Sequence, residues 1–137
     1  MPTATLTLTS ADIAGDPVNV SKTSTCYKAG TTVTLDQTGG LNKGILTTDS
    51  ANTILDAVAA GANKAAKVYI RNLSEVSTEY VTVTINATKV GDLYAGQWLF
   101  MPWSQNDTAA DVKVTASGAG LSIPVEYMLM HEGWSFA

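Results

Sequence analysis

The chain has 137 residues, of which 45% are hydrophobic and 15% charged, with a formal net charge of −4 and only eight Lys and Arg residues. This composition argues against a disordered acidic tail, and the scattered cations argue against the clustered basic surface that binds nucleic acid. The length suits one hydrophobic core, so a single β domain over residues 1–137 is expected.

The sequence shows no sign of membrane insertion or covalent cross-linking. No stretch approaches the roughly 18 consecutive apolar residues of a membrane-spanning helix. The first residues lack the positive charge and the continuous apolar run of a secretory signal, so we expect synthesis in a cytoplasm and no membrane partner. Cys26 is the only cysteine, which excludes a disulfide within the chain.

In chain order, the first predicted element is a strand over residues 3–9, where Thr alternates with Ala and Leu. The same period of two recurs along the chain and is typical of half-buried antiparallel strands. The further strands are predicted at residues 18–24, 31–35, 44–48, 53–58, 67–73, 80–85, 98–103, 112–116 and 124–131. About ten short strands separated by turn residues indicate an all-β fold, an antiparallel β-sandwich or a jelly-roll-like barrel.

Three connections are less regular than the strands. Residues 52–66 are rich in Ala and compete as a helical turn, although Gly61 interrupts them. Turns are predicted at Asp92–Gly96 and, as a hairpin, at Gly118–Gly120. Pro102 is expected to end its strand because it lacks a backbone N–H.

The two halves of the chain differ in composition. All three Trp residues lie after residue 97, and the first half is richer in Gly, Thr and Ser. The hydrophobic core is therefore expected within residues 66–131, with Ile70 on an inner face. Residues 1–15 are predicted to be either an edge strand or an N-terminal arm that reaches a neighbour, since an exposed alternating strand is a template for pairing.

Residues that catalysis would need do not form a recognisable site. His131 is the only histidine and lacks a second His or Cys at metal-site spacing, so it is expected at the rim of the last strand. Ser74 and Ser104 lie outside nucleophile motifs. The acidic pairs match neither a calcium loop nor an identifiable glycosidase site; they are Asp12 with Asp16, Glu75 with Glu79, and Asp107 with Asp111. We therefore expect no catalytic, cofactor-binding or metal-binding residues, and no enzyme.

Aromatic and leucine side chains give the candidate interface. Trp98 lies in the most apolar predicted strand and is assigned to the core, whereas Trp103 fits the core and the surface equally well. Trp134 and Phe136 follow the last predicted strand, where exposure to water would be costly, so a protein contact is expected. The candidate protein-interface residues are Leu6, Leu8, Trp103, Trp134 and Phe136.

Three segments of the second half carry a resemblance to a known class of proteins. They are Ala66–Asn72, Gly91–Pro102 and Ile123–Glu132. They resemble small virion proteins of tailed bacteriophages, in which a strand ending in Arg-Asn is followed by a Gly-containing turn, an apolar strand and a final strand with Glu and Tyr. The resemblance implies a capsid decoration (cement) protein of the virion. Such a protein would bind the major capsid protein by surface complementarity, and we expect it to self-associate as a trimer.

Two alternatives remain open from the sequence. A close variant places the protein in the tail, the neck or the base of a fibre of the virion. A different class is a carbohydrate-binding β-sandwich module, in which Trp103 and Trp134 would stack on sugar rings.

Overall fold

In the computed structural model, the described residues are 3–11, 18–27, 35, 37–38, 40–56, 65–104 and 110–131. Every regular element among them is a β-strand, and the strands pair antiparallel. The strands are β1 (Thr3–Ser10), β2 (Val18–Thr25), β3 (Gln37–Thr38), β4 (Asn42–Leu46), β5 (Asn52–Leu55), β6 (Ala65–Asn72), β7 (Tyr80–Ile85), β8 (Thr88–Tyr94), β9 (Trp98–Ser104), β10 (Val112–Ala116) and β11 (Ile123–His131). The prediction of an all-β fold is confirmed.

Strands β7 and β10 illustrate why these residues adopt extended backbone. Val81 and Val83 alternate with Thr along β7, while Val112 and Val114 alternate with polar residues along β10. Val114 lies directly opposite Val83, and all four side chains are fully buried. Burying one Val side chain contributes about 1.5–3 kcal/mol, and β-branched residues favour strands. The alternation therefore selects the strand and also its inner face.

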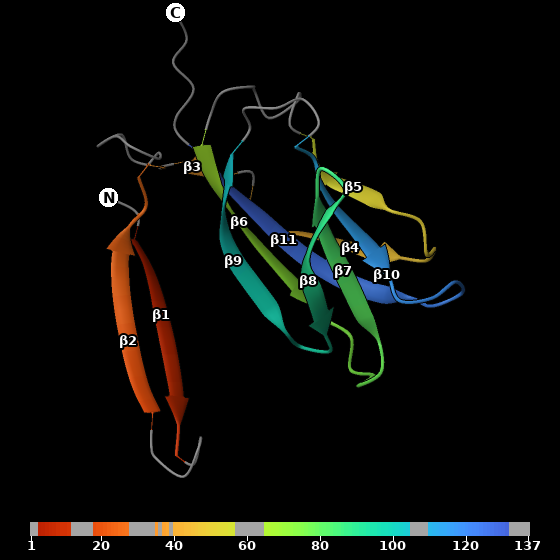
Figure 1. Ribbon diagram of the computed structural model, residues 1–137, viewed down its shortest axis with the longest axis horizontal. Helices are drawn as coiled ribbons and strands as arrows, with labels where there is room; N and C mark the ends of the chain where they lie inside the picture. Colours follow the sequence, from red (N-terminus) through yellow and green to blue (C-terminus); the bar gives the residue numbers. More distant parts are fainter. Residues whose placement is uncertain are drawn as a thin grey trace, which may run out of the picture.

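Strands β4 to β11 form two sheets that pack face to face (Figure 1). One sheet has the order β5-β10-β7-β8. The other has the order β4-β11-β6-β9, and the short β3 pairs with the far end of β11. Successive strands switch sheets except at the β7-β8 hairpin, and this interleaved order is that of an eight-stranded jelly roll. Of the two predicted architectures, the antiparallel sandwich is confirmed, because the described strands form two packed sheets and do not close into a barrel.

The hydrophobic core lies between the two sheets. It comprises Leu46, Ala66, Val68, Ile70, Val81, Val83, Leu93, Trp103, Ala110, Val112, Val114, Ala116, Ile123 and Val125. All but Leu46 fall within residues 66–131, as the distribution of apolar residues predicts. Ile70 is fully buried in this cluster, so its assignment to an inner face is correct.

Strand β8 is not predicted from the sequence. The sequence predicts a turn at Asp92–Gly96, but β8 continues to Tyr94 and the turn is confined to the next two residues. Gly91 within this strand has poor strand propensity, and the pairing of β8 with β7 contains a register shift. Pairing with a buried neighbour thus overrides local propensity. Gly96 in the turn has a φ of 76°, which glycine adopts without a Cβ clash.

Two further connections correct the sequence prediction. The loop at Gly118–Gly120 is not a hairpin turn, because β10 and β11 belong to different sheets and the loop crosses between them. Pro102 does not end its strand, since β9 continues to Ser104. Among the described strands β9 pairs only with β6, and an edge strand can accommodate a residue that lacks an N–H.

Two segments predicted in the first half of the chain, the helical turn at 52–66 and the strand at 31–35, lie only partly within the described residues. The competing helical segment begins as strand β5, and residues 57–64 lie outside the described part of the chain. Of the predicted strand 31–35, only Leu35 is described; it is buried, and its N–H donates to the carbonyl oxygen of Cys26 at 2.8 Å. Cys26 is a buried free cysteine.

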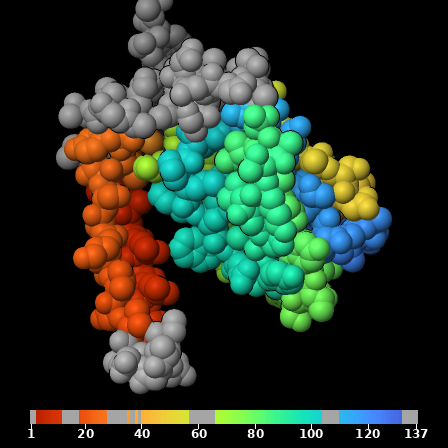
Figure 2. All heavy atoms as spheres, in the orientation of Figure 1, coloured from red at the N-terminus to blue at the C-terminus, as the bar shows by residue number. Residues whose placement is uncertain are grey.

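Strands β1 and β2 form a separate two-stranded sheet beside the sandwich, as Figure 1 and Figure 2 show. They pair in continuous register, from Thr3 opposite Thr25 to Ser10 opposite Val18. In the space-filling view a gap separates much of this hairpin from the neighbouring sheet (Figure 2). We call the β1-β2 hairpin the arm; it belongs to neither sheet of the sandwich.

Candidate functional site

The outer face of the sheet that contains β6, β9 and β11 carries large apolar side chains. Residues directly opposite one another on neighbouring strands share a face of the sheet. The two central rows of this outer face are Met128–Tyr69–Phe100 and Glu126–Arg71–Trp98. Three aromatic rings and a methionine therefore occupy one surface of the sandwich, on the side away from the core.

Strand β9 explains how apolar residues reach this outer face. Leu99 and Met101 pack against the core, and the alternation of the strand sends Trp98 and Phe100 to the opposite side. Trp98 is 52% exposed and Phe100 is 38% exposed. Contiguous exposed apolar surface of this kind marks a site of interaction in most proteins.

A hydrogen bond between Tyr69 and Glu126 orders the centre of this face. The Tyr69 hydroxyl donates to Oε1 of Glu126 at 2.7 Å and so supplies a donor to a buried carboxylate. Burial is the largest cause that raises the pKa of Tyr69 above its ordinary value, and the hydrogen bond to the Glu126 carboxylate and its negative charge raise that pKa further. The hydroxyl therefore stays protonated and keeps the Tyr69 ring in place.

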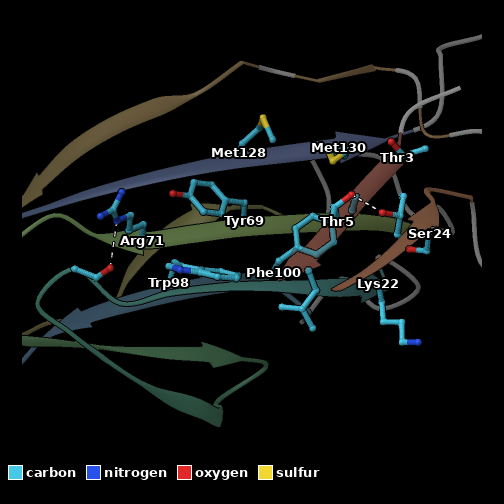
Figure 3. A pocket seen from close by; sticks show the side chains of 14 residues that line it. Thr3, Thr5, Lys22, Ser24, Tyr69, Arg71, Trp98, Phe100, Met128 and Met130 are labelled. Atoms are coloured by element: carbon cyan, nitrogen blue, oxygen red, sulfur yellow. Dashed lines mark hydrogen bonds between the residues drawn. The ribbon is translucent and has the colours of Figure 1, made fainter. Parts of the chain in front are cut away.

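The arm forms the opposite wall of a groove of about 840 Å³ over this face (Figure 3). The lining residues are Thr3, Ala4, Thr5, Leu6, Lys22, Thr23, Ser24, Tyr69, Arg71, Gly96, Trp98, Phe100, Met128 and Met130. The charged residues among them are Lys22 and Arg71, and no acidic residue occurs in this described lining. Arg71 is held at the rim, because its Nε donates to the carbonyl oxygen of Gly96 at 3.2 Å. The groove is thus largely apolar and has two cationic side chains in its described lining.

The arm has one apolar face and one hydroxyl-bearing face. Leu6 and Leu8 share the apolar face with Val20, and they are 50% and 52% exposed. On the other face, the hydroxyl oxygens of Thr5 and Thr23 are 2.6 Å apart. An isolated two-stranded hairpin is marginally stable in water. The leucine face of the arm is therefore a surface that gains stability when another element covers it.

The structure places the two tryptophans of β9 on opposite faces of their sheet. Trp103 is 2% exposed, and its Nε1–H donates to the carbonyl oxygen of Ala110 at 2.7 Å, so its assignment to the protein interface is wrong. Trp98, which the sequence assigns to the core, lies on the open outer face. The cause is that the odd-numbered residues of β9 face the core and the even-numbered residues face outward. A strand that is apolar on both sides gives no local signal of which set faces the core.

The remaining candidate interface residues divide into two groups. Leu6 and Leu8 lie on the exposed face of the arm, and Leu6 also lines the groove. Trp134 and Phe136 lie outside the described residues. The aromatic floor of the groove was not predicted from the sequence, where its signal is the apolar character of residues 98–103 on both sides of the strand.

A cluster of polar side chains at the end of β6 joins strands together. The buried Asn72 donates from Nδ2 to the carbonyl oxygens of Leu93 at 2.9 Å and of Glu79 at 3.3 Å. Its Oδ1 accepts the N–H of Ser74 at 2.8 Å, and the Ser74 hydroxyl donates to the Glu79 carboxylate. Asn72 therefore ties the end of β6 to β8, and the hydrogen bond between Ser74 and Glu79 holds the loop after β6.

His131 is the last residue of β11, at the rim of its sheet as predicted. Within the described ranges, no group of three or more His, Cys, Asp or Glu side chains is placed to hold a metal ion. The described part of the chain also contains no helix of the length and hydropathy needed to cross a membrane.

No protein-family model, curated protein or solved structure matches this chain. Its function is therefore inferred from the fold, the open surfaces and the resemblance of its second half to virion proteins.

Proposed function

We propose that this protein is a structural component of a bacteriophage virion, a capsid decoration protein that binds the major capsid protein and catalyses no reaction. The observation that carries the proposal is the arm, which lies beside a jelly-roll sandwich and leaves Leu6 and Leu8 half exposed. The jelly roll is a fold of viral capsid domains, and the resemblance of the second half to small virion proteins points to the same class.

The arm has the properties of an element that joins subunits. Each strand has eight residues, so the arm is about 27 Å long at the usual rise per residue. Among the described strands β1 and β2 pair only with each other, so each has one edge whose backbone groups can pair with a neighbouring strand. The leucine face would add apolar contact. In a trimer, three such arms would contact the capsid where capsomers meet.

Binding to capsid shells tests this role. Shells are assembled from the major capsid protein of the virion, and the protein is added before sedimentation. We expect the unmodified protein to sediment with shells, and the double variant Leu6→Ser with Leu8→Ser to remain in the supernatant. The matched control is Thr7→Ser, which changes the other face of the arm. If the unmodified protein does not bind shells and is absent from the mass spectrum of virions, the proposal fails.

Location in the tail, the neck or a fibre base is the close variant of this role. Disrupted virions can be separated into heads and tails, and the protein can be followed with an antibody. A decoration protein is expected in the head fraction. Recovery with the tails would move the proposal to the tail assembly and would exclude the capsid role.

A carbohydrate-binding module is a second candidate, and one observation favours it. Trp98 and Phe100 are exposed on the same face of β9 beside Arg71, an arrangement that can stack on sugar rings. Trp103 cannot take this part, because it lies in the core. Binding to a glycan array that is lost in Trp98→Ala would support the module, and an array without signal would exclude the glycans tested.

A further inference from the structure

The groove combines a free strand edge with an apolar floor. In Figure 1, β1 lies between β2 and the sandwich, and four consecutive β1 residues, Thr3–Leu6, line the groove. Among the described strands β1 pairs only with β2, so its other edge presents N–H and C=O groups on the groove side. The floor is formed by side chains such as Tyr69, Phe100 and Met128. An extended peptide recognises this combination, because its backbone pairs with the edge while alternate side chains contact the floor.

Residues 132–137 have the composition that this groove would accept. Their sequence is Glu-Gly-Trp-Ser-Phe-Ala, so an extended backbone would project Trp134 and Phe136 to one side and Ser135 to the other. Aromatic rings make favourable contacts with methionine sulfur and with other rings. Trp134 and Phe136 have the same spacing of two residues as Met128 and Met130 on the floor. Two aromatic side chains can therefore match two methionines along one strand.

The position of this segment in the chain also favours the groove. Met130 lines the groove and is followed by His131, the last residue of β11, so the described part of the chain ends beside the groove. Gly133 can adopt the backbone conformations that a reversal of the chain requires. Glu132 brings a negative charge toward a groove whose described charged lining residues are Lys22 and Arg71.

We propose that this groove is a strand-binding site occupied by residues 132–137 of the same chain, with Trp134 and Phe136 on the floor and the backbone paired with β1. A tethered segment this close to its site experiences an effective concentration of about millimolar, which favours it over a segment from another molecule. The segment would join the arm to the sandwich and fix the angle between them. This occupancy does not depend on which partner the arm binds.

Methionine methyl NMR tests the occupancy in the full chain. Aromatic rings above the floor shift the methyl signals of Met128 and Met130, whereas Met101 packs against the core and serves as an internal reference. The double variant Trp134→Ala with Phe136→Ala is expected to remove the part of the Met128 ring-current shift that these two rings add to that of the neighbouring Tyr69, and to leave Met101 unchanged. The matched control Ser135→Ala is expected to leave both signals in place. An unchanged Met128 signal in the double variant would overturn the proposal.

A second measurement uses the unmodified protein and so does not depend on a variant that folds. Nuclear Overhauser contacts are expected between the Met128 methyl group and ring protons of Trp134 or Phe136, and their absence would reject the site. Dilution separates the same chain from a second copy. Occupancy within one chain predicts constant contacts and a monomer mass by sedimentation at low concentration. Contacts that disappear on dilution together with a dimer mass would show exchange between copies and overturn the proposal.

Discussion

The sandwich and the arm are built from strands of the same alternating kind, yet they are stabilised in different ways. In β7, the alternate Val residues are fully buried between two sheets. In β1, the alternate Leu6 and Leu8 remain half exposed, although their strand is as regular as β7. A period of two therefore specifies a strand and its apolar side, but the burial of that side depends on what the tertiary structure places against it.

A charge placed on the apolar side of a strand should destabilise the sandwich far more than the arm. Ile70→Asp would bury an unpaired carboxylate in the core and is expected to cost about 4 kcal/mol or more in the free energy of unfolding. Leu6→Asp on the arm is expected to cost about 0.5 kcal/mol, because that position is open to water. Urea unfolding measures both values. Equal costs would mean that the arm packs as tightly as the sandwich.

The two tryptophans of β9 give the same comparison within one strand. Trp103→Ala would leave a cavity and remove a buried hydrogen bond, with an expected cost of about 3–5 kcal/mol. Trp98→Ala is expected to cost about 1 kcal/mol or less, because the side chain lies on the open face. Thermal unfolding of the two variants provides the check. A larger loss of stability for Trp98→Ala than for Trp103→Ala would contradict the burial of Trp103 and the exposure of Trp98.

A smaller effect is expected at the buried amide of Asn72. Asn72→Ala would leave the carbonyl oxygens of Leu93 and Glu79 without this donor, at an expected cost of about 1–3 kcal/mol. Asn42→Ala is the control, because the Asn42 amide donates to the carbonyl oxygen of Gly40 in an exposed turn. The control is expected to unfold at the same urea concentration as the parent. A parent-like midpoint for Asn72→Ala would show that water replaces its hydrogen bonds.

The smallest expected effect is a pH dependence at Tyr69. Burial and Glu126 raise the pKa of Tyr69 in the folded protein above its ordinary value of 10.0. Above pH 10.0 the unfolded chain therefore releases this proton before the folded chain does, and stability falls as the pH rises through the folded pKa. Tyr69→Phe removes this contribution, so its stability should fall less steeply above pH 10.0 than that of the parent. If stability falls with the same slope in Tyr69→Phe and in the parent, the pKa of Tyr69 is not raised by folding.

Several strands could be predicted to the residue because local chemistry and tertiary packing agree there. The bounds of β7 and β10 match the prediction at both ends, since alternating Val residues end at turn or polar residues. Strand β8 could not be found in the same way, because Gly91 and Asp92 weaken its propensity and only its pairing with β7 holds it extended. The candidate site was predicted in part: Leu6 and Leu8 are exposed, whereas the aromatic floor was not identified.

The all-β class, the positions of most strands and the apolar side of each alternating strand follow from the local pattern of residues along the chain. Which side of β9 faces the core, and hence that Trp103 is buried while Trp98 lines the groove, depends on how the strands pack together. The pairing of β1 with β2 outside the sandwich is likewise settled by the tertiary structure. These outcomes depend on which strands pair and which faces pack together. A strand that is apolar on both faces, or an arm with one free edge, is compatible with more than one such arrangement.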